Sequence, residues 1–427
     1  MTDASAASPA HQDASAPQPA HDATAPSGGQ EPVGMEAAPG HVADDLGLVL
    51  TGGGARGAYQ VGVLSWIARH YPDVSVPILT GVSAGAVNAA KLAARTGSFR
   101  QGVDELEGLW SELTTEQVFQ AGPLDLLWNG ARWGMRLLSA GSRSAPRVRG
   151  LLETAPLRTL LEETLATVNG RVTGIDYNLE RGALKAAAFI TTSYTTGQTV
   201  VFLQGRDIEP WQRPQRKAVR APITVDHVMA SAALPIFFPA VQIGEHWYGD
   251  GGIRLAAPLS PALHLGAHRV LAISTRYDRS AAEADRPATV GYPPPAQMLG
   301  VLLNAVFLDL IDQDMHRLER INQLLEVLPP DQRDGMRPVR LLVMRPSKDM
   351  GVLAARYEPR LPWALRFMAR GLGTQETRSA DVLSMLMFQP RYLQRLIRLG
   401  KQDAERNGAR IDAFLQGAPS DAVAAGS

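Results

Sequence analysis

Cysteine is absent from the 427 residues of this chain. Disulfides, cysteine nucleophiles and thiolate metal sites are therefore excluded. Long apolar runs are missing too, because no window approaches the roughly 18 consecutive apolar residues that a membrane-spanning helix needs. The N-terminus also lacks the basic segment and the apolar core of a signal peptide. These absences predict a cytoplasmic protein without a transmembrane segment, and they leave peripheral contact with a membrane open.

Basic residues are absent before Arg56, whereas seven acidic residues precede it. The rest of the chain therefore holds all 42 basic residues and 35 of the 42 acidic ones, a net charge of +7. Such a body favours anionic surfaces, but no nucleic-acid-binding motif accompanies it, so no nucleic acid partner is expected. Residues 1–44 are rich in Ala, Pro and Ser and predict a disordered leader. Residues 417–427 predict a flexible tail.

Short apolar runs alternate with helical patterns once the leader ends. The run at 46–50 leads through a glycine-rich turn into a helix over 58–70, and the run at 76–83 leads into an Ala-rich helix. Repeated strand–turn–helix units predict a parallel sheet covered by helices. Further strands are expected at 185–192, 198–203, 241–243, 246–248, 269–274 and 339–344. We predict a catalytic domain over 45–275 and a mostly helical C-terminal region over 276–416 that packs on it.

A nucleophile motif lies between the second strand and its helix. The segment from Gly81 to Gly85 reads Gly-Val-Ser-Ala-Gly, which matches G-x-S-x-G with Ser83 at its centre. A nucleophile elbow requires this strand-to-helix setting, and its tight turn requires small residues beside the serine. The pattern is also compatible with a glycine-rich turn in which Ser83 is only a helix cap.

A glycine block follows the first strand and runs from Thr51 to Gly57 as TGGGARG. Consecutive glycines let backbone N–H groups converge on an oxyanion or on a phosphate. The spacing of Gly52, Gly54 and Gly57 also fits a dinucleotide-binding motif, but the second strand ends without the acidic residue that such a site needs. A P-loop is excluded because Gly-Lys-Ser/Thr is missing. The nearby serine motif favours the oxyanion interpretation.

The proton acceptor for Ser83 has two candidate types. None of the nine histidines has a distinctive local setting. Asp250 follows a short aromatic strand and precedes Gly251 and Gly252, so its side chain can point into a cleft, and an aspartate can serve as base in a two-residue dyad. A simple turn aspartate gives the same local pattern.

Together these segments resemble the patatin-like phospholipase family. GGGARGAYQVGVL is similar to its glycine-rich block, GVSAGAVNA to its nucleophile block, ASAALPIFFPAV to its proline-containing block and DGG to its second catalytic motif, in the family's order. The resemblance is strong over 46–275 and looser from Met298 onward. One departure is that Leu255-Ala256-Ala257-Pro258 replaces the Asn-Pro pair that many members carry.

The resemblance implies a three-layer α/β/α fold with a central, mostly parallel sheet and a C-terminal helical extension. It implies a Ser83–Asp250 dyad, an oxyanion hole from Gly52, Gly53 and Gly54, and an acyl-enzyme mechanism on lipid esters. The supporting motif residues are Arg56, Gly57, Gly81, Gly85, Gly251 and Gly252, and Arg56 is expected to shape the glycine loop and its charge. No metal or organic cofactor is expected, since no His or carboxylate cluster has ligand spacing. The alternative is a non-catalytic lipid-binding or scaffold protein on the same fold.

Two stretches combine tryptophan with arginine, a composition that suits a lipid interface or a lid. One covers 126–138 and includes Trp128 and Trp133. The other contains Trp363, Arg366, Phe367 and Arg370. Both are equally compatible with helices that pack their apolar residues into the core.

Overall fold

A computed structural model of the chain describes residues 45–120, 150–289, 291–307, 310–377 and 379–416. The predicted leader at 1–44, the predicted tail at 417–427 and the Trp/Arg stretch at 126–138 lie outside these residues. The description that follows concerns the unit that begins at Val42.

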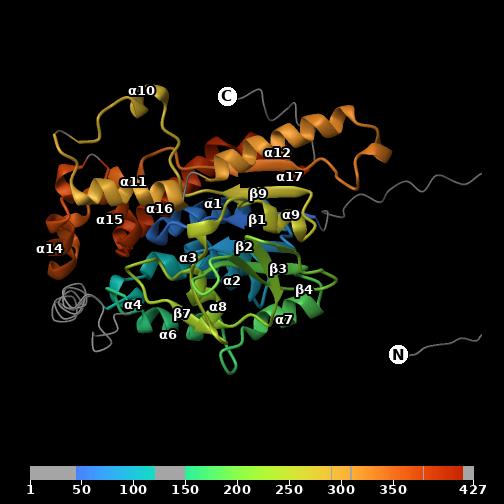
Figure 1. Cartoon of the computed structure of the whole chain (residues 1–427), viewed down its shortest axis with the longest axis horizontal. Coiled ribbons are helices and arrows are strands. Elements are labelled where there is room, and N and C mark those ends of the chain that lie inside the picture. The colour runs from blue at the N-terminus through green and yellow to red at the C-terminus, as the bar shows by residue number, and fades with distance from the viewer. Residues whose placement is uncertain (1–44, 121–149, 290, 308–309, 378, 417–427) are drawn as a thin grey trace, which may run out of the picture. The chain divides into compact units, whose positions relative to one another are not determined.

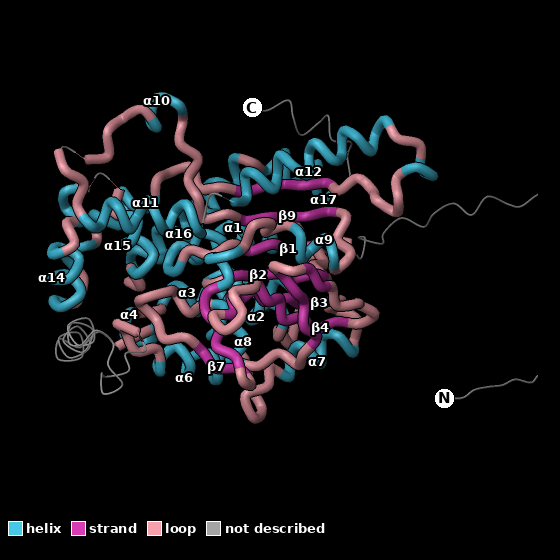
Figure 2. Tube along the Cα trace, in the orientation of Figure 1, coloured by secondary structure: helices cyan, strands magenta, loops and turns pink. Residues whose placement is uncertain are grey.

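A 10-stranded sheet forms the middle of this unit (Figures 1 and 2). Its main path runs β10-β9-β1-β2-β3-β4-β6-β5, while β8 pairs with β3 and β7 pairs with β8. The strands are β1 (Leu46–Leu50), β2 (Ile78–Val82), β3 (Ala186–Ser193), β4 (Thr199–Gly205), β5 (Gln212–Arg213), β6 (Arg216–Arg220), β7 (Val241–Ile243), β8 (His246–Asp250), β9 (Arg269–Ile273) and β10 (Arg340–Met344). The path from β10 to β3 is parallel throughout, and antiparallel pairing begins between β3 and β4.

Helices connect and cover these strands. They are α1 (Gly57–His70), α2 (Ala84–Ala93), α3 (Phe99–Glu112), α4 (Thr115–Val118), α6 (Ala155–Thr164), α7 (Thr173–Glu180), α8 (Val225–Ser231), α9 (Ser260–His264), α10 (Ala281–Ala284), α11 (Pro295–Phe307), α12 (Leu310–Val327), α13 (Met350–Ala355), α14 (Trp363–Gly371), α15 (Asp381–Leu386), α16 (Pro390–Arg406) and α17 (Gly408–Gln416). Short 3-10 turns include η1 (Gly54–Arg56), η2 (Gly251–Arg254), η3 (Pro330–Gln332), η4 (Glu358–Arg360) and η5 (Thr374–Glu376).

Alternating side chains of the strands enter two hydrophobic cores. In β1, Leu46, Leu48 and Leu50 join the core built with α1, α2, α3 and α16, whereas Val49 joins the core built with α9 and α12. A strand buried on both faces reads as a continuous apolar run, because successive residues point to opposite faces. The predicted three-layer α/β/α fold with its mostly parallel sheet is therefore confirmed.

The C-terminal region contributes to the sheet as well as to the helices. Arg340 to Met344 form β10, which pairs in parallel with β9 from Arg269 to Ile273. The predicted strand at 339–344 is thus present, and the sheet crosses the domain boundary that we placed at 275. Strands β5 and β6 had no sequence prediction. Strand β6 reads Arg-Lys-Ala-Val-Arg, which has no apolar run and no alternation, and it is recognisable only through its pairing with β4.

One stretch of the chain meets the length and mean hydropathy of a membrane-spanning helix, although it contains no run of about 18 apolar residues. It covers Pro295–Val327, includes residues outside the described ones, and has 29% of its most apolar window buried. Helix α11 alone has 13 residues, about 20 Å of helix against about 30 Å of bilayer hydrocarbon. Helix α12 carries charges from Asp312 onward. Core helices of soluble proteins meet the same criterion, so it assigns no span.

Candidate active site

Ser83 lies at a sharp turn between β2 and α2. Its backbone has φ 56° and ψ −129°, a region that a residue with a side chain rarely adopts. Such a conformation costs about 1–3 kcal/mol and persists where the surrounding structure enforces it. The turn projects the Ser83 side chain from the carboxyl end of β2 at the first turn of α2, where the helix dipole favours negative charge. This is the geometry of a nucleophile elbow.

Gly81 and Gly85 make the elbow possible because backbones pack against them directly. A Cβ on Gly81 would lie 2.6 Å from the carbonyl carbon of Gly85, and one on Gly85 would lie 2.5 Å from the carbonyl carbon of Leu50. Real Cβ atoms do not approach other atoms this closely. The predicted need for small residues beside Ser83 therefore agrees with the packing of β2, α2 and β1.

A buried serine of α8 holds the elbow in place. The Ser231 hydroxyl accepts a hydrogen bond from the Ser83 N–H at 3.1 Å and donates one to the Ile190 carbonyl at 2.6 Å. Ser231 is fully buried, so both backbone groups depend on it. It lies in the block ASAALPIFFPAV, whose hydrogen-bonding role the sequence did not reveal.

Replacing Ser231 with alanine is expected to lower the free energy of unfolding by about 1–3 kcal/mol, because it leaves a buried N–H and a buried carbonyl without their partner. We also expect any reaction in which the Ser83 hydroxyl is the nucleophile to slow about tenfold as the elbow loosens. Urea unfolding and initial rates would measure both effects. Ser111→Ala is the control, since the Ser111 hydroxyl donates to the Gly108 carbonyl on an exposed part of the last turn of α3. If Ser231→Ala and Ser111→Ala had the same free energy of unfolding and the same rate, the prediction would be contradicted.

Strand β3 brings Asp250 to Ser83. Val82, the last residue of β2, pairs with Ile190, and Asp250, the last residue of β8, pairs with Thr191. Strand β4 pairs with Thr191 from one side of β3, so β8 must pair with Thr191 from the opposite side. Strand β2 lies on that same opposite side and pairs with β3 as far as Ile190. Strand β8 thus takes the place of β2 where β2 leaves the sheet. The ends of the two strands, with Ser83 and Asp250, meet at adjacent positions of β3.

The Asp250 carboxylate is fully buried. Its Oδ1 accepts a hydrogen bond from the Gly252 N–H at 2.9 Å, and its Oδ2 has no hydrogen bond of ordinary geometry among the described residues. Burial raises the pKa of Asp250 to about 7, although hydrogen bonding from the Ser83 hydroxyl and from Gly252 works in the opposite direction. Contacts between a nucleophile and its base are often loose in the free protein and tighten with substrate. A carboxylate with this pKa can accept a proton near neutral pH.

The glycine block forms a loop beside Ser83. Gly53 and Gly54 have φ values of 142° and 57°, which glycine adopts without strain. Within the described chain, no recorded hydrogen bond uses the N–H of Gly53 or Gly54 as donor. Both residues line the same pocket as Ser83. Gly52 is equally close, because a Cβ there would lie 3.0 Å from the Ser83 Cβ.

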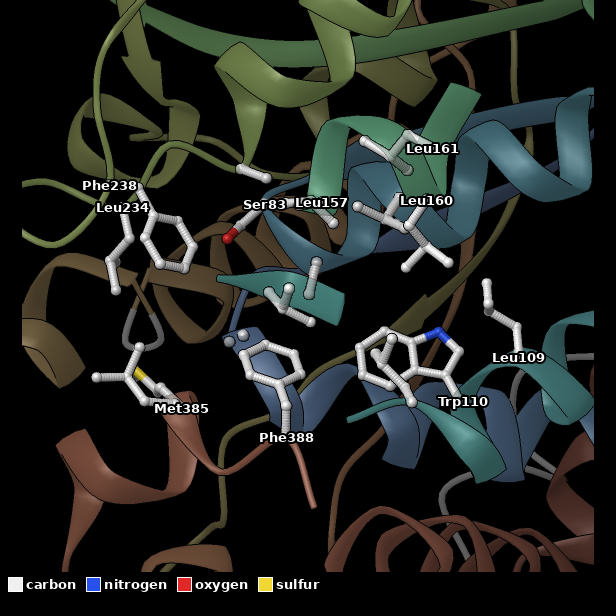
Figure 3. Close-up of a pocket in the computed structure, with 18 of the residues that line it drawn as sticks. Ser83, Leu109, Trp110, Leu157, Leu160, Leu161, Leu234, Phe238, Met385 and Phe388 are labelled. Carbon is white, nitrogen blue, oxygen red and sulfur yellow. The ribbon is translucent and has the colours of Figure 1, made fainter. Parts of the chain in front are cut away.

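An apolar pocket opens over Ser83 and the loop, and Figure 3 shows the Ser83 oxygen facing its side chains. Apart from Ser83, Thr164 and the two glycines, its lining is apolar or aromatic. Even the Trp110 indole N–H is turned to the Asn88 Oδ1 at 2.7 Å, which leaves the ring as an apolar surface. Residues from four parts of the chain form the walls, among them Leu109, Trp110, Leu157, Leu160, Leu161, Leu234, Phe238, Met385 and Phe388. This lining can hold a hydrocarbon chain.

The remaining motif residues support this arrangement through contacts. A Cβ on Gly57 would lie 3.0 Å from the Ala84 Cβ and 3.0 Å from the Trp110 ring, and one on Gly251 would lie 2.5 Å from the Ile190 carbonyl carbon. Gly252 provides the N–H that binds Asp250. Arg56 is buried and points away from the apolar pocket, toward Asp381 and Ser384.

Histidines and metal ligands are not part of this arrangement. In the part of the chain that the structure describes, no recorded hydrogen bond joins a histidine to Ser83 or Asp250. Burial lowers the pKa of His227 to about 4, and its ring accepts the Thr224 N–H at the start of α8. The described residues contain no cluster of His, Asp and Glu that could hold a metal ion.

Several residues that shape the site carried no local signal in the sequence. Thr275 follows β9 and donates from its hydroxyl to the Gly52 carbonyl at 2.5 Å. Met385, Leu386 and Phe388, more than 300 residues beyond the glycine block, form one wall of the pocket. These contacts join distant segments, so no motif or periodicity could have revealed them.

Comparison with known proteins gives one family and several distant structures. The family described as patatin-like phospholipase matches residues 48–263. VipD from Legionella pneumophila is 13% identical with a TM-score of 0.34, and the match covers 88% of this chain and 67% of that one. Human GIVD cytosolic phospholipase A2 is 10% identical with a TM-score of 0.44, covering 87% and 62%. The same human enzyme bound to methyl gamma-linolenyl fluorophosphonate gives 14% identity, a TM-score of 0.40 and coverage of 87% and 59%.

These structural similarities are too low to support an argument about activity, and this chain spans about three fifths to two thirds of the chains that it matches. No curated protein sequence matches it. The family match covers half of the 427 residues and contains Ser83, Asp250 and the glycine block. The chain therefore belongs to the patatin-like phospholipase family of lipid acyl hydrolases.

Proposed function

We propose that this protein hydrolyses acyl esters of lipids through a Ser83–Asp250 dyad. The observation that carries the proposal is the β3 register, which brings the ends of β2 and β8 together at the mouth of an apolar pocket. The Ser83 oxygen attacks the ester carbonyl while its proton passes to the Asp250 carboxylate. The carbonyl oxygen becomes an oxyanion, which the N–H groups of Gly53 and Gly54 stabilise.

The second half of the reaction uses the same groups. Asp250 returns the proton to the departing alcohol as the carbon–oxygen bond breaks, which leaves an acyl group on Ser83. A water molecule then attacks this acyl-enzyme, giving its proton to Asp250, and the fatty acid leaves as Ser83 recovers its proton. The apolar pocket holds the acyl chain, so the substrates that fit best are esters with a long hydrocarbon chain.

Labelling with a fluorophosphonate tests this proposal directly. The probe reacts with an activated serine and forms a covalent phosphonyl-enzyme, so we expect one label per chain on the peptide that contains Ser83. Mass spectrometry after proteolysis would locate it, and a panel of esters would give the preferred chain length. A folded protein in which Ser83 never reacts and no ester is cleaved would instead support the alternative of a non-catalytic lipid-binding protein.

We propose further that a surface of α11 and α14 makes peripheral contact with an anionic membrane. Trp363 and Phe367 are separated by one helical turn on α14 and are 60% and 74% exposed. The neighbouring surface of α11 exposes Met298, Val301 and Leu302. The first turn of α11 meets the C-terminal end of α14, where the Ala296 N–H donates to the Leu372 carbonyl at 2.8 Å (Figure 1). Exposed aromatic and aliphatic side chains of this kind insert into the interface of a bilayer.

The arginines of α14 and the segment before it bear on the proposed contact with an anionic membrane. Residues 358–376 contain three arginines, Arg360, Arg366 and Arg370, and two glutamates, Glu358 and Glu376, and Arg370 pairs with the buried Glu358 at 3.5 Å. Arginines beside exposed aromatic rings are suited to anionic lipid headgroups. Beneath α14, Leu361, Leu365 and Leu386 line a second apolar pocket, and Leu386 also lines the pocket over Ser83. A lipid that reaches this surface is therefore close to the proposed active site.

Replacing Trp363 and Phe367 together by serine is expected to weaken binding to vesicles of phosphatidylcholine and phosphatidylglycerol about 10- to 100-fold, because two exposed apolar side chains no longer insert. Hydrolysis of a soluble short-chain ester should not change. Vesicle sedimentation and initial rates would measure the two effects. Tyr177→Ser is the matched control, since Tyr177 is 51% exposed on α7. Undiminished vesicle binding, or a shift from dimer to monomer in solution, would assign this surface to another role.

A further inference from the structure

A segment of the C-terminal region lies directly on the glycine loop. Gly54 has no room for a side chain, because a Cβ there would overlap the carbonyl group of Met385. Met385 and Leu386 end α15, and their side chains line the apolar pocket together with Phe388 (Figure 3). The family match ends at residue 263, so this segment is a feature of this chain beyond the matched region.

Arg56 joins the loop to the same segment through polar contacts. Its Nε donates to the Ser384 Oγ at 2.7 Å, and its Nη2 donates to the Asp381 Oδ1 at 2.6 Å and to the Asp381 carbonyl at 3.3 Å. The Arg56 and Asp381 side chains are 4% and 13% exposed. Water screens such a pair weakly, and removal of one partner leaves the other charge buried and unpaired.

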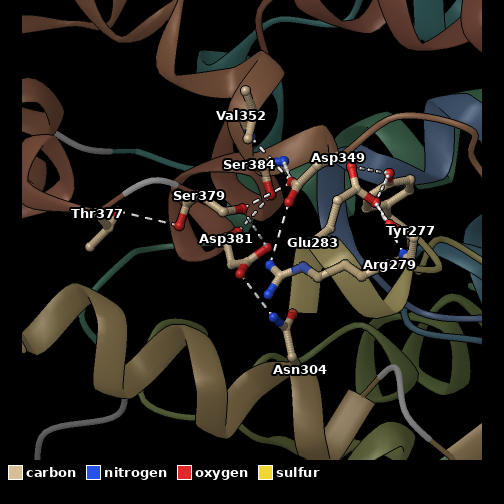
Figure 4. A network of polar contacts seen from close by, with 12 residues as sticks. Tyr277, Arg279, Glu283, Asn304, Asp349, Val352, Thr377, Ser379, Asp381 and Ser384 are labelled. Atoms are coloured by element: carbon tan, nitrogen blue, oxygen red, sulfur yellow. Dashed lines mark hydrogen bonds and ion pairs between the residues drawn. The ribbon is translucent and has the colours of Figure 1, made fainter. Parts of the chain in front are cut away.

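Asp381 is itself fixed by further contacts, which Figure 4 shows. The Asn304 side-chain amide donates to its Oδ2 at 2.8 Å, and the Ser379 hydroxyl lies 3.3 Å from its Oδ1. Ser379 also donates to the Asp349 Oδ1 at 2.9 Å, and the same oxygen caps α13 through the N–H groups of Gly351 and Val352. The carboxylate thus links Arg56 to three elements of the C-terminal region: α11, α13 and α15.

We propose that Asp381 is a positioning residue for the hydrolytic reaction, and that it acts through Arg56. It holds the glycine loop on α15, so that the N–H groups of Gly53 and Gly54 and the wall of Met385, Leu386 and Phe388 keep a fixed relation to Ser83. The inference rests on the proposed function of Ser83 and the loop. It adds that the C-terminal region completes the active site rather than merely covering it.

Physical reasoning gives the size of the effect. Loss of one oxyanion donor costs about 100- to 1000-fold in kcat. A loop that has lost its fixed contact places its donors less accurately without removing them, so a smaller loss is expected. Binding of the alkyl chain depends on apolar contacts that remain near the loop, so KM for a short-chain ester should change little.

The experiment compares Asp381→Ala, Asp381→Asn, Arg56→Gln and the double variant Arg56→Gln/Asp381→Ala in the full chain. We expect kcat to fall about 10- to 100-fold in each single variant except Asp381→Asn, which keeps an acceptor for Arg56 and should recover part of the loss. KM for a short-chain ester should stay within about threefold. The rate of fluorophosphonate labelling should fall with kcat, because the phosphonyl oxygen uses the same N–H donors. The double variant should be no slower than the slower single variant.

Asp45→Ala serves as the matched control. Asp45 pairs with Arg269 at 3.0 Å, with side chains that are 23% and 5% exposed, and it lies at the start of β1 away from Ser83. Loss of the Asp45 carboxylate should lower the melting temperature about as much as loss of the Asp381 carboxylate, while kcat stays unchanged. Equal kcat losses in Asp45→Ala and Asp381→Ala, or a kcat of Asp381→Ala within threefold of wild type, would overturn the proposal. Ser83→Ala is measured in parallel. If Ser83→Ala remains active, both the proposed dyad and the positioning role of Asp381 are wrong. If Ser83→Ala is inactive and Asp381→Ala is fully active, only the positioning role is wrong.

Discussion

Replacing Ser83 with alanine is expected to reduce ester hydrolysis by roughly 10⁴- to 10⁶-fold, because the acyl-enzyme can no longer form. Asp250→Asn should also lose at least roughly 1000-fold, since an amide cannot accept the serine proton. The variant that carries both changes should be about as slow as Ser83→Ala, because the two groups act as a unit. Initial rates on a long-chain ester and fluorophosphonate labelling would measure all three variants.

The control for these losses is a second buried aspartate. Asp403 of α16 is 1% exposed and binds the Ser347 N–H and hydroxyl at 2.8 Å and 2.6 Å. Asp403→Asn should lower stability but leave hydrolysis intact, which separates loss of a buried carboxylate from loss of the base. Wild-type activity in Asp250→Asn would remove Asp250 from the mechanism and return the histidines to consideration.

The pH dependence of kcat/KM is the second prediction with a large expected effect. The proposed reaction needs Asp250 in its ionised form, and burial raises the pKa of Asp250 to about 7. We therefore expect kcat/KM to rise about tenfold for each pH unit up to about pH 7 and then to level off. Tyr194 faces the same carboxylate, but burial, with a smaller contribution from the charge of Asp250, raises its pKa to about 12, so it stays neutral in this range. A rate profile with its midpoint near pH 4 would contradict the assignment of the buried carboxylate as base.

The same carboxylate should lower the stability of the protein as the pH rises. Its pKa is higher in the folded protein than in the unfolded chain, so the folded state favours the protonated form and loses stability between about pH 4 and pH 7. Asp250→Asn removes this cost. Its free energy of unfolding relative to wild type should rise over that interval by up to about 4 kcal/mol and stay constant above pH 7. Urea unfolding at pH 5 and pH 8 would measure the difference, and an equal difference at both values would contradict it.

Local patterns in the sequence were sufficient for most of the parallel sheet. The runs at 46–50, 76–83 and 269–274 predicted β1, β2 and β9, because strands buried on both faces must be apolar at every position. Strand β6, which lies between β4 and β5, was missed because Arg216–Arg220 has no apolar run and is specified by its ladder with β4. The sequence analysis did not single out Pro295–Val327, because a count of uninterrupted apolar residues is stricter than a mean hydropathy, and the stretch assigns no membrane span.

Ser83 was identifiable from the sequence alone because a nucleophile elbow is local: strand, serine, two glycines and helix occupy consecutive positions. Its relation to Asp250 is of a different kind, since 167 residues separate them and only the pairing of β2 and β8 with β3 brings their backbones together. The sequence could name Asp250 through resemblance, but its raised pKa follows from burial in the folded protein. The contact between Arg56 and Asp381 spans 325 residues and left no trace in composition or spacing. The sequence by itself therefore determined most strands of the parallel sheet and the turn that carries Ser83, through apolar runs and glycine placement. Tertiary structure decided which carboxylate lies beside Ser83, which residues form the pocket wall and what packs on the glycine loop, because non-local packing has no local signature.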